Sequence, residues 1–368
     1  MSHRIVVWGT GNVGRPALRS VLAHREMELA GVVVANPDKT GRDAGELCGL
    51  GATGVLATKD RSAALAPDVD AVVYCATGDS RPAEALTDVM DCLRAGRNVV
   101  TTSLYALQHP ATAPPQLAEK IAEACSQGGS SIFVSGVDPG WLIDILPLLL
   151  SGVIADIEEI RCRELFNYAL YDQPDVVRNV VGMGLSMDEL PPMLQEFSLR
   201  FVWEPNLRVL AEGLGAPLDE IRTTVERRPL EADVDVPGMG RFEAGTQGAF
   251  RFEVQGCIEG TPRLVVEHVT RIDDACAPDW PYPENGSGAH GVRIKGRPNL
   301  ELFFHADDPL ESGPGAGGNA TAAARIVNAI PGVCGAAPGI RTALDLAPVT
   351  GVGQARWGAQ DPRPSSLR

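Results

Sequence analysis

The feature that most constrains the fold is a glycine-rich turn near the start of the chain. Gly9-Thr10-Gly11-Asn12-Val13-Gly14 matches G-x-G-x-x-G and lies between an apolar strand pattern and a helix pattern. Gly9 permits a tight turn, Gly11 lets a diphosphate approach the main chain, and Gly14 lets helix and strand pack closely. The N–H groups at the start of the helix favour a phosphate. The turn predicts a dinucleotide-binding site made of these residues.

Strand and helix patterns alternate through residues 1–150. Continuous apolar runs are typical of parallel strands that are buried on both faces. The repetition predicts a doubly wound Rossmann domain, and it favours cofactor binding over a purely structural role for the turn. The predicted strands are Ile5–Trp8, Leu29–Val34, Ala71–Cys75, Val99–Thr101 and Ile132–Val134, and the clearest helices are Pro82–Ala95 and Gln116–Ser126.

The pattern changes after about residue 150. We expect a long strand at 152–166, helical segments over 174–215 and alternating strands over 219–306. Alternation of polar and apolar residues predicts an antiparallel or mixed sheet with one covered face. The chain is therefore expected to be an α/β protein with a C-terminal α+β domain. Its predicted limits and breaks are a domain at 151–318, helix breaks at Pro191, Pro192 and Pro205, a flexible linker at 312–318, a return helix within 319–350 and a loose tail at 357–368.

Composition excludes several classes of protein. The chain has 368 residues and a net charge of −15, which argues against binding a nucleic-acid phosphate backbone. No two of the eight cysteines lie within four residues of each other, so the spacing of a zinc site is missing and we expect no metal. They are typical of buried thiols in a reducing compartment. The most apolar run, residues 141–155, is too short to span a bilayer, and the chain opens directly into a strand. We expect a cytoplasmic protein without a membrane partner.

The end of the second predicted strand bears on the choice of cofactor. NAD-binding proteins usually carry an acid about 20 residues after the glycine turn, where it holds the ribose 2′-OH. Here Asn36 stands at that point, and Lys39 and Arg42 follow. A neutral amide with two cations favours a 2′-phosphate, so NADP is the preferred cofactor and NAD the alternative. Lys39 and Arg42 could instead be solvated loop charges, with Asp38 reaching the ribose.

Small residues follow two more strands of the predicted sheet. Cys75-Ala76-Thr77-Gly78 and Thr101-Thr102-Ser103 lie at carboxyl ends of parallel strands, where ligands of such sheets bind. Their size would leave room for the nicotinamide ribose, although ordinary turn chemistry is the alternative. We add Cys75, Ala76, Thr77, Thr102 and Ser103 to the predicted cofactor site.

Several segments resemble one enzyme family. Residues 41–47, Gly-Arg-Asp-Ala-Gly-Glu-Leu, resemble the segment after the second strand of dihydrodipicolinate reductases. Three further segments resemble the branch of 2,4-diaminopentanoate dehydrogenases and native amine dehydrogenases. They are Gly136-Val137-Asp138-Pro139-Gly140-Trp141 with Asp144 and Leu146-Pro147, residues 277–281 and residues 321–331. Together the segments cover most of the chain.

The resemblance implies hydride transfer between NAD(P)H and the imine or carbonyl carbon of a small molecule. It also implies that the C-terminal domain contacts the substrate and forms a homodimer, and that the last helix packs on the Rossmann domain. Two departures matter. The HHxxK signature of dihydrodipicolinate reductases is absent, and residues 101–110 lack the glutamate that amine dehydrogenases carry after the fifth strand.

Other side chains are candidates for proton transfer and substrate binding. Tyr105 stands where the family's acid would lie, and His109 is a second candidate donor; a pocket wall and an exposed loop are the alternatives. Trp141 matches the family's substrate-facing aromatic residue, and Asn167 and Tyr168 follow the first strand of the second domain. Asp138 is predicted to cap a helix that begins at Pro139. His290 and His305 look too isolated to hold a metal.

These observations favour an NAD(P)H-dependent oxidoreductase that acts on a small ketone, aldehyde or imine. The missing glutamate leaves two alternatives open. One is a catalytically silent NAD(P)-binding regulator. The other is an amine dehydrogenase with a relocated acid, for example Glu164 on the long predicted strand.

Overall fold

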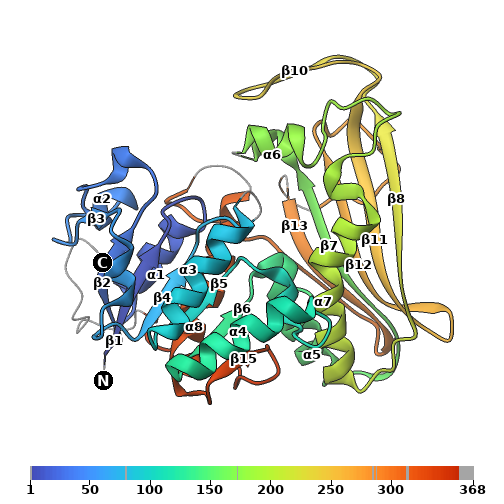
Figure 1. Ribbon diagram of the computed structural model, residues 1–368. Helices are drawn as coiled ribbons and strands as arrows, with labels where there is room; N and C mark the ends of the chain where they lie inside the picture. The colour runs from blue at the N-terminus through green and yellow to red at the C-terminus, as the bar shows by residue number, and fades with distance from the viewer. Residues whose placement is uncertain are drawn as a thin grey trace. The chain divides into compact units, whose positions relative to one another are not determined.

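The structure is a computed structural model that describes residues 2–78, 81–171, 173–283, 286, 288–311 and 315–355 (Figure 1). The chain divides into two compact units. Unit 1 holds Met1–Val137 and Asn319–Arg368, and unit 2 holds Asp138–Gly318. The tail predicted at 357–368 lies outside the described residues. No helix in the described ranges is both long and apolar enough to cross a bilayer.

Unit 1 contains a seven-stranded parallel sheet with the order β15-β6-β5-β4-β1-β2-β3. The central strand β4 is hydrophobic and buried throughout, and the hydrophobic residues of its neighbours β1 and β5 are buried, which confirms the predicted doubly wound domain. The direction of strand order reverses between β1 and β4, and ligands of such sheets bind at this switch point. The strands are β1 His3–Trp8, β2 Met27–Val33, β3 Ala57–Thr58, β4 Ala71–Tyr74, β5 Asn98–Thr101, β6 Ser131–Val134 and β15 Gly339–Arg341.

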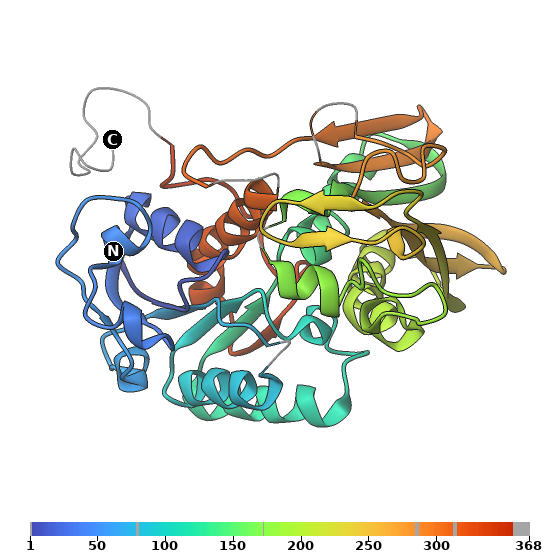
Figure 2. The same ribbon diagram turned by 90° about the horizontal axis from the view of Figure 1, so that it is seen from above.

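Helices cover both faces of this sheet. Helices α3 and α4 lie on one face and α1 and α8 on the other (Figure 2). On the second face, the Arg325 guanidinium of α8 lies 5.3 Å from the centre of the Phe133 ring on β6. The helix limits are α1 Gly14–Ala23, α2 Ala44–Leu47, α3 Pro82–Arg94, α4 Pro115–Gly128 and α8 Gly315–Gly335.

The linker predicted at 312–318 is wrong in its second half. Gly315–Gly318 belong to helix α8, while residues 312–314 lie outside the described residues. A Cβ atom on Gly317 would lie 1.8 Å from the carbonyl oxygen of Ala306, so this glycine permits close packing. The glycines that indicated flexibility therefore serve a tight helix contact. The helix continues through Pro331 and ends at Gly335, within the predicted range 319–350.

The glycine turn allows close packing of the main chain at the switch point of the sheet in unit 1. Gly9 has a φ of +97°, and a Cβ atom there would lie 2.9 Å from the main chain of Cys75 and Ala76. A Cβ atom on Gly14 would lie 2.1 Å from the carbonyl oxygen of Gly9. At Gly11 the same atom would meet nothing within 4 Å. Gly9 and Gly14 are thus required by the protein's own packing, whereas Gly11 leaves open space.

Unit 2 contains a six-stranded mixed sheet with the order β14-β13-β7-β12-β11-β8. Strands β7 and β12 run parallel, and all other neighbours in this sheet are antiparallel, as the predicted mixed sheet requires. The limits are β7 Ala155–Asn167, β8 Glu220–Pro229, β11 Gln247–Ile258, β12 Thr261–Arg271, β13 Gly288–Arg297 and β14 Leu300–Phe304, with β9 Val234–Val236 and β10 Gly240–Phe242 forming a separate hairpin.

Helix α7 (Glu196–Leu214) packs on one face of this sheet, and α5 (Ile145–Ser151) and α6 (Pro174–Asn179) are two further helices of unit 2. The break predicted at Pro205 is wrong, because α7 continues through this proline. Proline costs a helix interior about 3 kcal/mol through its missing N–H. Leu199, Trp203 and Leu207 on the same helix are almost fully buried, and burying each apolar side chain contributes about 2 kcal/mol. Packing against the sheet therefore outweighs the local cost.

The opposite face of the sheet carries a charged network. Glu267 on β12 is 0% exposed and contacts Arg163 at 2.8 Å, Arg161 at 3.2 Å and Arg251 at 2.6 Å. Burial alone would raise the pKa of Glu267, but these three guanidinium groups outweigh burial and hold its pKa below the ordinary value. Glu267 is therefore a buried carboxylate on this face.

Gly14→Ala should destabilise unit 1 because the new methyl group would collide with the Gly9 carbonyl. Overpacking of this kind typically costs about 1–3 kcal/mol. Gly11→Ala is the matched control, since its methyl group meets no protein atom within 4 Å. Urea unfolding of both variants measures the difference, and equal midpoints would contradict this account of Gly14.

Candidate active site

The predicted cofactor residues of unit 1 lie at the carboxyl edge of its sheet. The turn from Gly9 to Gly14 joins β1 to α1, and Cys75 follows β4 directly. The Ser103 hydroxyl donates to the Ala76 carbonyl at 2.8 Å, so the loops after β4 and β5 are joined. Burial raises the pKa of the Cys75 thiol to about 12, so this side chain stays neutral. Thr77 and Thr102 lie in the same two loops and keep part of their surface exposed.

Three cations lie near the end of β2. Lys39 Nζ donates to the carbonyl oxygen of Thr10 at 2.8 Å and contacts its hydroxyl at 3.2 Å. Burial lowers the pKa of Lys39, and the charges of Arg15 and Arg42 lower it further. Asn36 caps the following turn by accepting from the Asp38 N–H. Three positive charges thus lie beside the glycine turn. One of them, Arg15 on the first turn of α1, was not predicted from the sequence.

The segment after β5 has a strained backbone. Leu104 has a φ of +67°, in the left-handed region that residues other than glycine seldom adopt. This backbone conformation costs about 1 kcal/mol. The turn Tyr105–Gln108 follows, with Tyr105 half-buried. The His109 Nδ1 atom lies 2.8 Å from the Thr112 hydroxyl, within its own loop.

A row of ionisable residues crosses the sheet of unit 2. His268 on β12, Glu164 on β7 and His290 on β13 are direct cross-strand neighbours. They lie on the face that α7 covers. Phe252 is paired with His268 on one side of the row, and Phe304 is paired with His290 on the other. The register of two strand pairs, β12 with β7 and β13 with β7, therefore brings two histidines to one glutamate.

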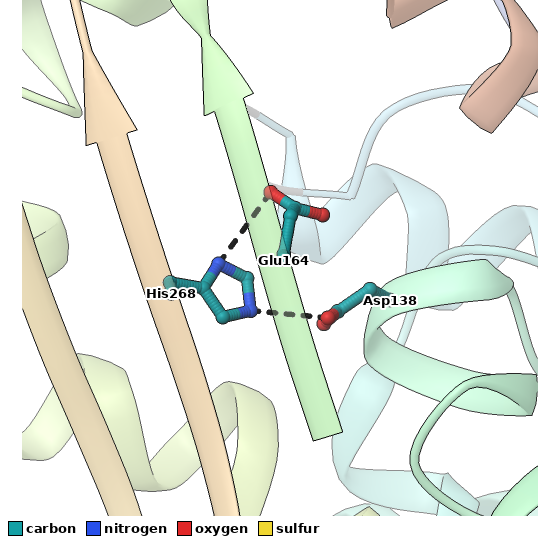
Figure 3. A group of neighbouring side chains, drawn as sticks. All are labelled: Asp138, Glu164 and His268. Atoms are coloured by element: carbon teal, nitrogen blue, oxygen red, sulfur yellow. Dashed lines mark hydrogen bonds and ion pairs between the residues drawn. The ribbon is translucent and has the colours of Figure 1, made fainter. Parts of the chain in front are cut away.

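His268 lies between two carboxylates that contact different ring nitrogens (Figure 3). Its Nε2 atom is 3.1 Å from Asp138 Oδ2, and its Nδ1 atom is 3.5 Å from Glu164 Oε1. The other oxygen of Asp138 accepts from the Trp203 indole N–H at 2.7 Å. Because an ionised carboxylate only accepts hydrogen bonds, an imidazole that is protonated on both nitrogens fits this arrangement.

Electrostatic interactions favour the charged forms of His268 and Asp138. Burial opposes the charge of His268, but Asp138 and Glu164 outweigh burial and raise the pKa of His268. Burial likewise opposes the charge of Asp138, but His268, His290 and the Trp203 hydrogen bond hold the pKa of Asp138 below its ordinary range. Each group thus favours the charged form of the other.

Glu164 has further partners and the greatest exposure of the group. Its Oε2 atom contacts His290 Nε2 at 3.2 Å, and Oε1 accepts from the Tyr168 hydroxyl at 3.3 Å. Burial and the Glu164 charge raise the pKa of Tyr168 well above its ordinary value, so its hydroxyl keeps its proton. The Glu164 side chain is 13% exposed, against 5% or less for Asp138, His268 and His290.

Aromatic rings surround the row. The Phe252 ring stacks on His268 with centroids 4.5 Å apart, and the Trp203 ring meets His268 edge-on at 4.9 Å. Phe304 stacks on His290 at 5.2 Å. Trp141 packs edge-on against Phe304 at 5.6 Å, so this predicted substrate residue lies in the same aromatic group. The rings exclude water from the histidines and fix their planes.

The structure corrects the role predicted for Asp138. Its backbone is extended, with φ −147° and ψ 109°, and Pro139 does not begin a helix. The cap of α5 is Asp144, which accepts from the Ile145 N–H. Asp138 instead uses its carboxylate on Trp203 and His268, 65 and 130 residues away. A local cap pattern could not reveal partners so distant in the sequence.

The remaining predicted residues divide between the row and its surroundings. Tyr168 contacts Glu164, whereas Asn167 donates to Asp274 at 2.8 Å and accepts from the Ala169 N–H. Glu164 and His290, noted separately in the sequence, are brought together. His268 and Trp203 were missed. The alternation along β12 could have indicated His268, because Leu264, Val266 and His268 share one face.

Three of these side chains lie close enough together to be considered as metal ligands. Asp138, Glu164 and His268 each offer an atom within 4.8 Å of the others. A metal would need a free imidazole nitrogen, but both nitrogens of His268 face carboxylates. Both nitrogens of His268 therefore have carboxylate partners without an ion.

Comparison with known proteins agrees with this architecture. Residues 3–110 match the dihydrodipicolinate reductase N-terminus, and residues 141–357 match the 2,4-diaminopentanoate dehydrogenase C-terminal domain. An amine dehydrogenase of Streptomyces virginiae is 53% identical over 343 residues, covering 93% of this chain and 95% of that protein. The 2,4-diaminopentanoate dehydrogenase of Acetoanaerobium sticklandii is 24% identical and covers 93% of each chain.

A solved structure shares the whole fold. The amine dehydrogenase from Mycobacterium smegmatis has a TM-score of 0.74 and 22% identity, covering 96% of this chain and 99% of that one. The chain is thus an NAD(P)-dependent oxidoreductase of amine or carbonyl substrates, which confirms the enzymatic interpretation over a silent regulator. It belongs to the family of 2,4-diaminopentanoate and amine dehydrogenases, as its sequence motifs indicated.

Asp138→Asn should reduce stability in a pH-dependent way. The lowered pKa of Asp138 means that its contribution is present above the ordinary Asp pKa of about 3.9 and is lost in acid. The raised pKa of His268 means that its contribution is present below about pH 6.5 and is lost as the pH rises through the native value.

The loss in unfolding free energy should therefore be on the order of 3 kcal/mol between about pH 4 and 6.5, and smaller in alkali. Denaturant unfolding of the wild type and the variant across this range measures it. A difference that does not change with pH would contradict the assignment of charge.

Proposed function

We propose that this chain is an amine dehydrogenase that interconverts a primary amine with a carbonyl compound and ammonia, using NADP in preference to NAD. Glu164 is the acid and base of the reaction. The observation that carries this proposal is the position of Glu164, whose side chain contacts His268 and His290 and is more exposed than those two histidines or Asp138. The relocated acid considered from the sequence is thus supported over a simple carbonyl reductase.

The residues of unit 1 fit a bound dinucleotide. Gly11 leaves open space beside the start of α1, where main-chain N–H groups suit a diphosphate. We assign the diphosphate to the turn from Gly9 to Gly14 and the nicotinamide ribose to the loops with Cys75, Ala76, Thr77, Thr102 and Ser103. When bound, the cofactor supplies or accepts a hydride at the nicotinamide ring.

Glu164 would handle the protons of the reaction. Its carboxylate accepts a proton from ammonium, which frees the nitrogen lone pair for attack on the carbonyl carbon. The attack leaves an alkoxide and an ammonium group, and a proton moves from the nitrogen to the oxygen to give the neutral carbinolamine. The carboxyl group then donates its proton to the carbinolamine hydroxyl, which leaves as water, and the nitrogen lone pair forms the iminium ion that accepts the hydride. The neutral Tyr168 hydroxyl, 3.3 Å from Glu164, orients the carboxylate by donating to it. The proton balance closes on one carboxylate.

Other predicted residues take supporting roles in this proposal. Trp141 and Tyr168 supply aromatic surface for the apolar part of the substrate. Tyr105 and His109 remain alternative proton donors after β5, beside the strained Leu104. Homodimer formation and a cytoplasmic location stay predictions of the sequence.

Glu164→Gln should abolish most amine oxidation while leaving the fold intact. A positioned acid or base contributes about 10²- to 10⁴-fold to rate, so kcat should fall by that range. The assay follows NADPH formation at 340 nm with a panel of primary amines from butylamine to cyclohexylamine. Glu301→Gln, on the partly exposed strand β14, is the control and should keep wild-type activity. If Glu164→Gln keeps full activity and Tyr105→Phe loses activity, the result would contradict the role of Glu164 and indicate Tyr105 as the acid.

Asn36→Asp should shift the cofactor preference from NADP towards NAD. Aspartate can keep the cap to the Asp38 N–H, but its charge repels a 2′-phosphate and accepts from a ribose 2′-OH. The ratio of kcat/KM for NADP over NAD should fall about tenfold or more, which corresponds to about 1.4 kcal/mol. Lys120→Gln, on helix α4, removes a cation that is not part of the proposed cofactor site and should leave the ratio unchanged. An unchanged ratio in Asn36→Asp would argue against a 2′-phosphate beside this residue.

A further inference from the structure

Behind Glu164 lies a pair of residues that no step of the proposed reaction uses. We propose that Asp138 and His268 are positioning residues that fix the carboxylate of Glu164 for proton transfer, with the Trp203 indole as their anchor. This inference rests on the proposed role of Glu164. Asp138 acts only through His268, because its two oxygens contact Trp203 and His268.

The anchor leaves Asp138 little freedom. Trp203 lies on α7, and its indole N–H holds Asp138 Oδ1 at 2.7 Å. Asp138 Oδ2 holds His268 Nε2 at 3.1 Å, and the Asp138 side chain is 1% exposed. A buried carboxylate with a partner for each oxygen cannot rotate without leaving a hydrogen-bonding group unpaired, which typically costs about 1–3 kcal/mol in proteins.

The imidazole plane is fixed independently of its hydrogen bonds. Phe252 stacks on it at an interplanar angle of 19°, and the Trp203 ring meets it at 69°. The two rings come from β11 and α7, so the sheet and the helix clamp His268 from different directions. Nδ1 is thereby aimed at Glu164 Oε1.

Glu164 is consequently held from two strands. His268 on β12 contacts Oε1 and His290 on β13 contacts Oε2, both as direct cross-strand neighbours. These contacts set the plane of the carboxylate, while its 13% exposure leaves an approach for the substrate nitrogen. Loss of Asp138 would let His268 turn or lose its charge, and Glu164 would lose one of its two histidine contacts.

A double-mutant cycle between Asp138→Asn and Glu164→Gln tests the inference. Asp138→Asn should lower kcat for the best amine of the panel at least tenfold, with little change in KM for the amine or for NADP. In the Glu164→Gln background the same substitution should change the residual kcat less than twofold, because the group it positions is already absent. A purely structural role predicts equal losses in both backgrounds and would overturn the proposal.

Trp203→Phe provides a second, gentler variant that keeps an aromatic ring against His268 and removes the indole N–H. Its kcat should fall in the same direction as that of Asp138→Asn, by a smaller factor, and again only when Glu164 is present. NADP binding and thermal unfolding of each variant confirm that the protein is folded. If neither variant lowers kcat in the wild-type background, the positioning role is excluded.

The outcomes separate this inference from the function on which it rests. Full activity of Glu164→Gln would remove the proposed acid, and the positioning role with it. Loss of activity in Glu164→Gln together with additive effects of Asp138→Asn would keep the acid and overturn the positioning pair alone.

Discussion

Ionised groups inside unit 2 are stable only because each faces a partner of opposite charge. His268 meets Asp138 through one ring nitrogen and Glu164 through the other. Removing one partner of such a buried pair commonly costs about 3–5 kcal/mol, since a charge is left without compensation. The turn at Asp138, the sheet and helix α7 must therefore meet in one arrangement. The chemistry proposed for Glu164 depends on that arrangement, because the same contacts that stabilise the charges also orient the carboxylate.

Unit 1 satisfies a different constraint, which is steric. Gly9 and Gly14 allow the first strand, the first helix and the loop after β4 to approach more closely than side chains would permit. The result is an edge where main-chain N–H groups and three nearby cations suit an anionic ligand. One unit thus prepares a site for phosphate through the absence of side chains. In the proposed reaction, the other holds the acid and base Glu164 through buried side chains whose charges compensate one another.

The sequence predicted the doubly wound unit well because its signals are local. A short apolar run or the glycine turn can be recognised without knowing what lies beside it in space. Asp138 could not be interpreted in this way, since its partners lie 65 and 130 residues away. Its local context of aspartate before proline indicated a helix cap, but in the structure its carboxylate makes long-range contacts instead. Pro205 and the glycines before residue 319 were misread for the same reason, because packing overrode a local preference. Glu164 was found as a candidate, but its histidine partners depend on strand register, which the pattern alone does not define.

Strand β12 places Glu267 and His268 side by side in the chain and on opposite faces of the sheet. Sliding this strand by one position would exchange the two faces. Glu267 would then join two other acids, and His268 would enter a cluster of three guanidinium groups. Like charges would meet on both sides at once. Electrostatic repulsion therefore destabilises mispaired forms of the sheet, in addition to the exposure of apolar surface. The adjacent acid and imidazole thus help to specify a single register of strand β12.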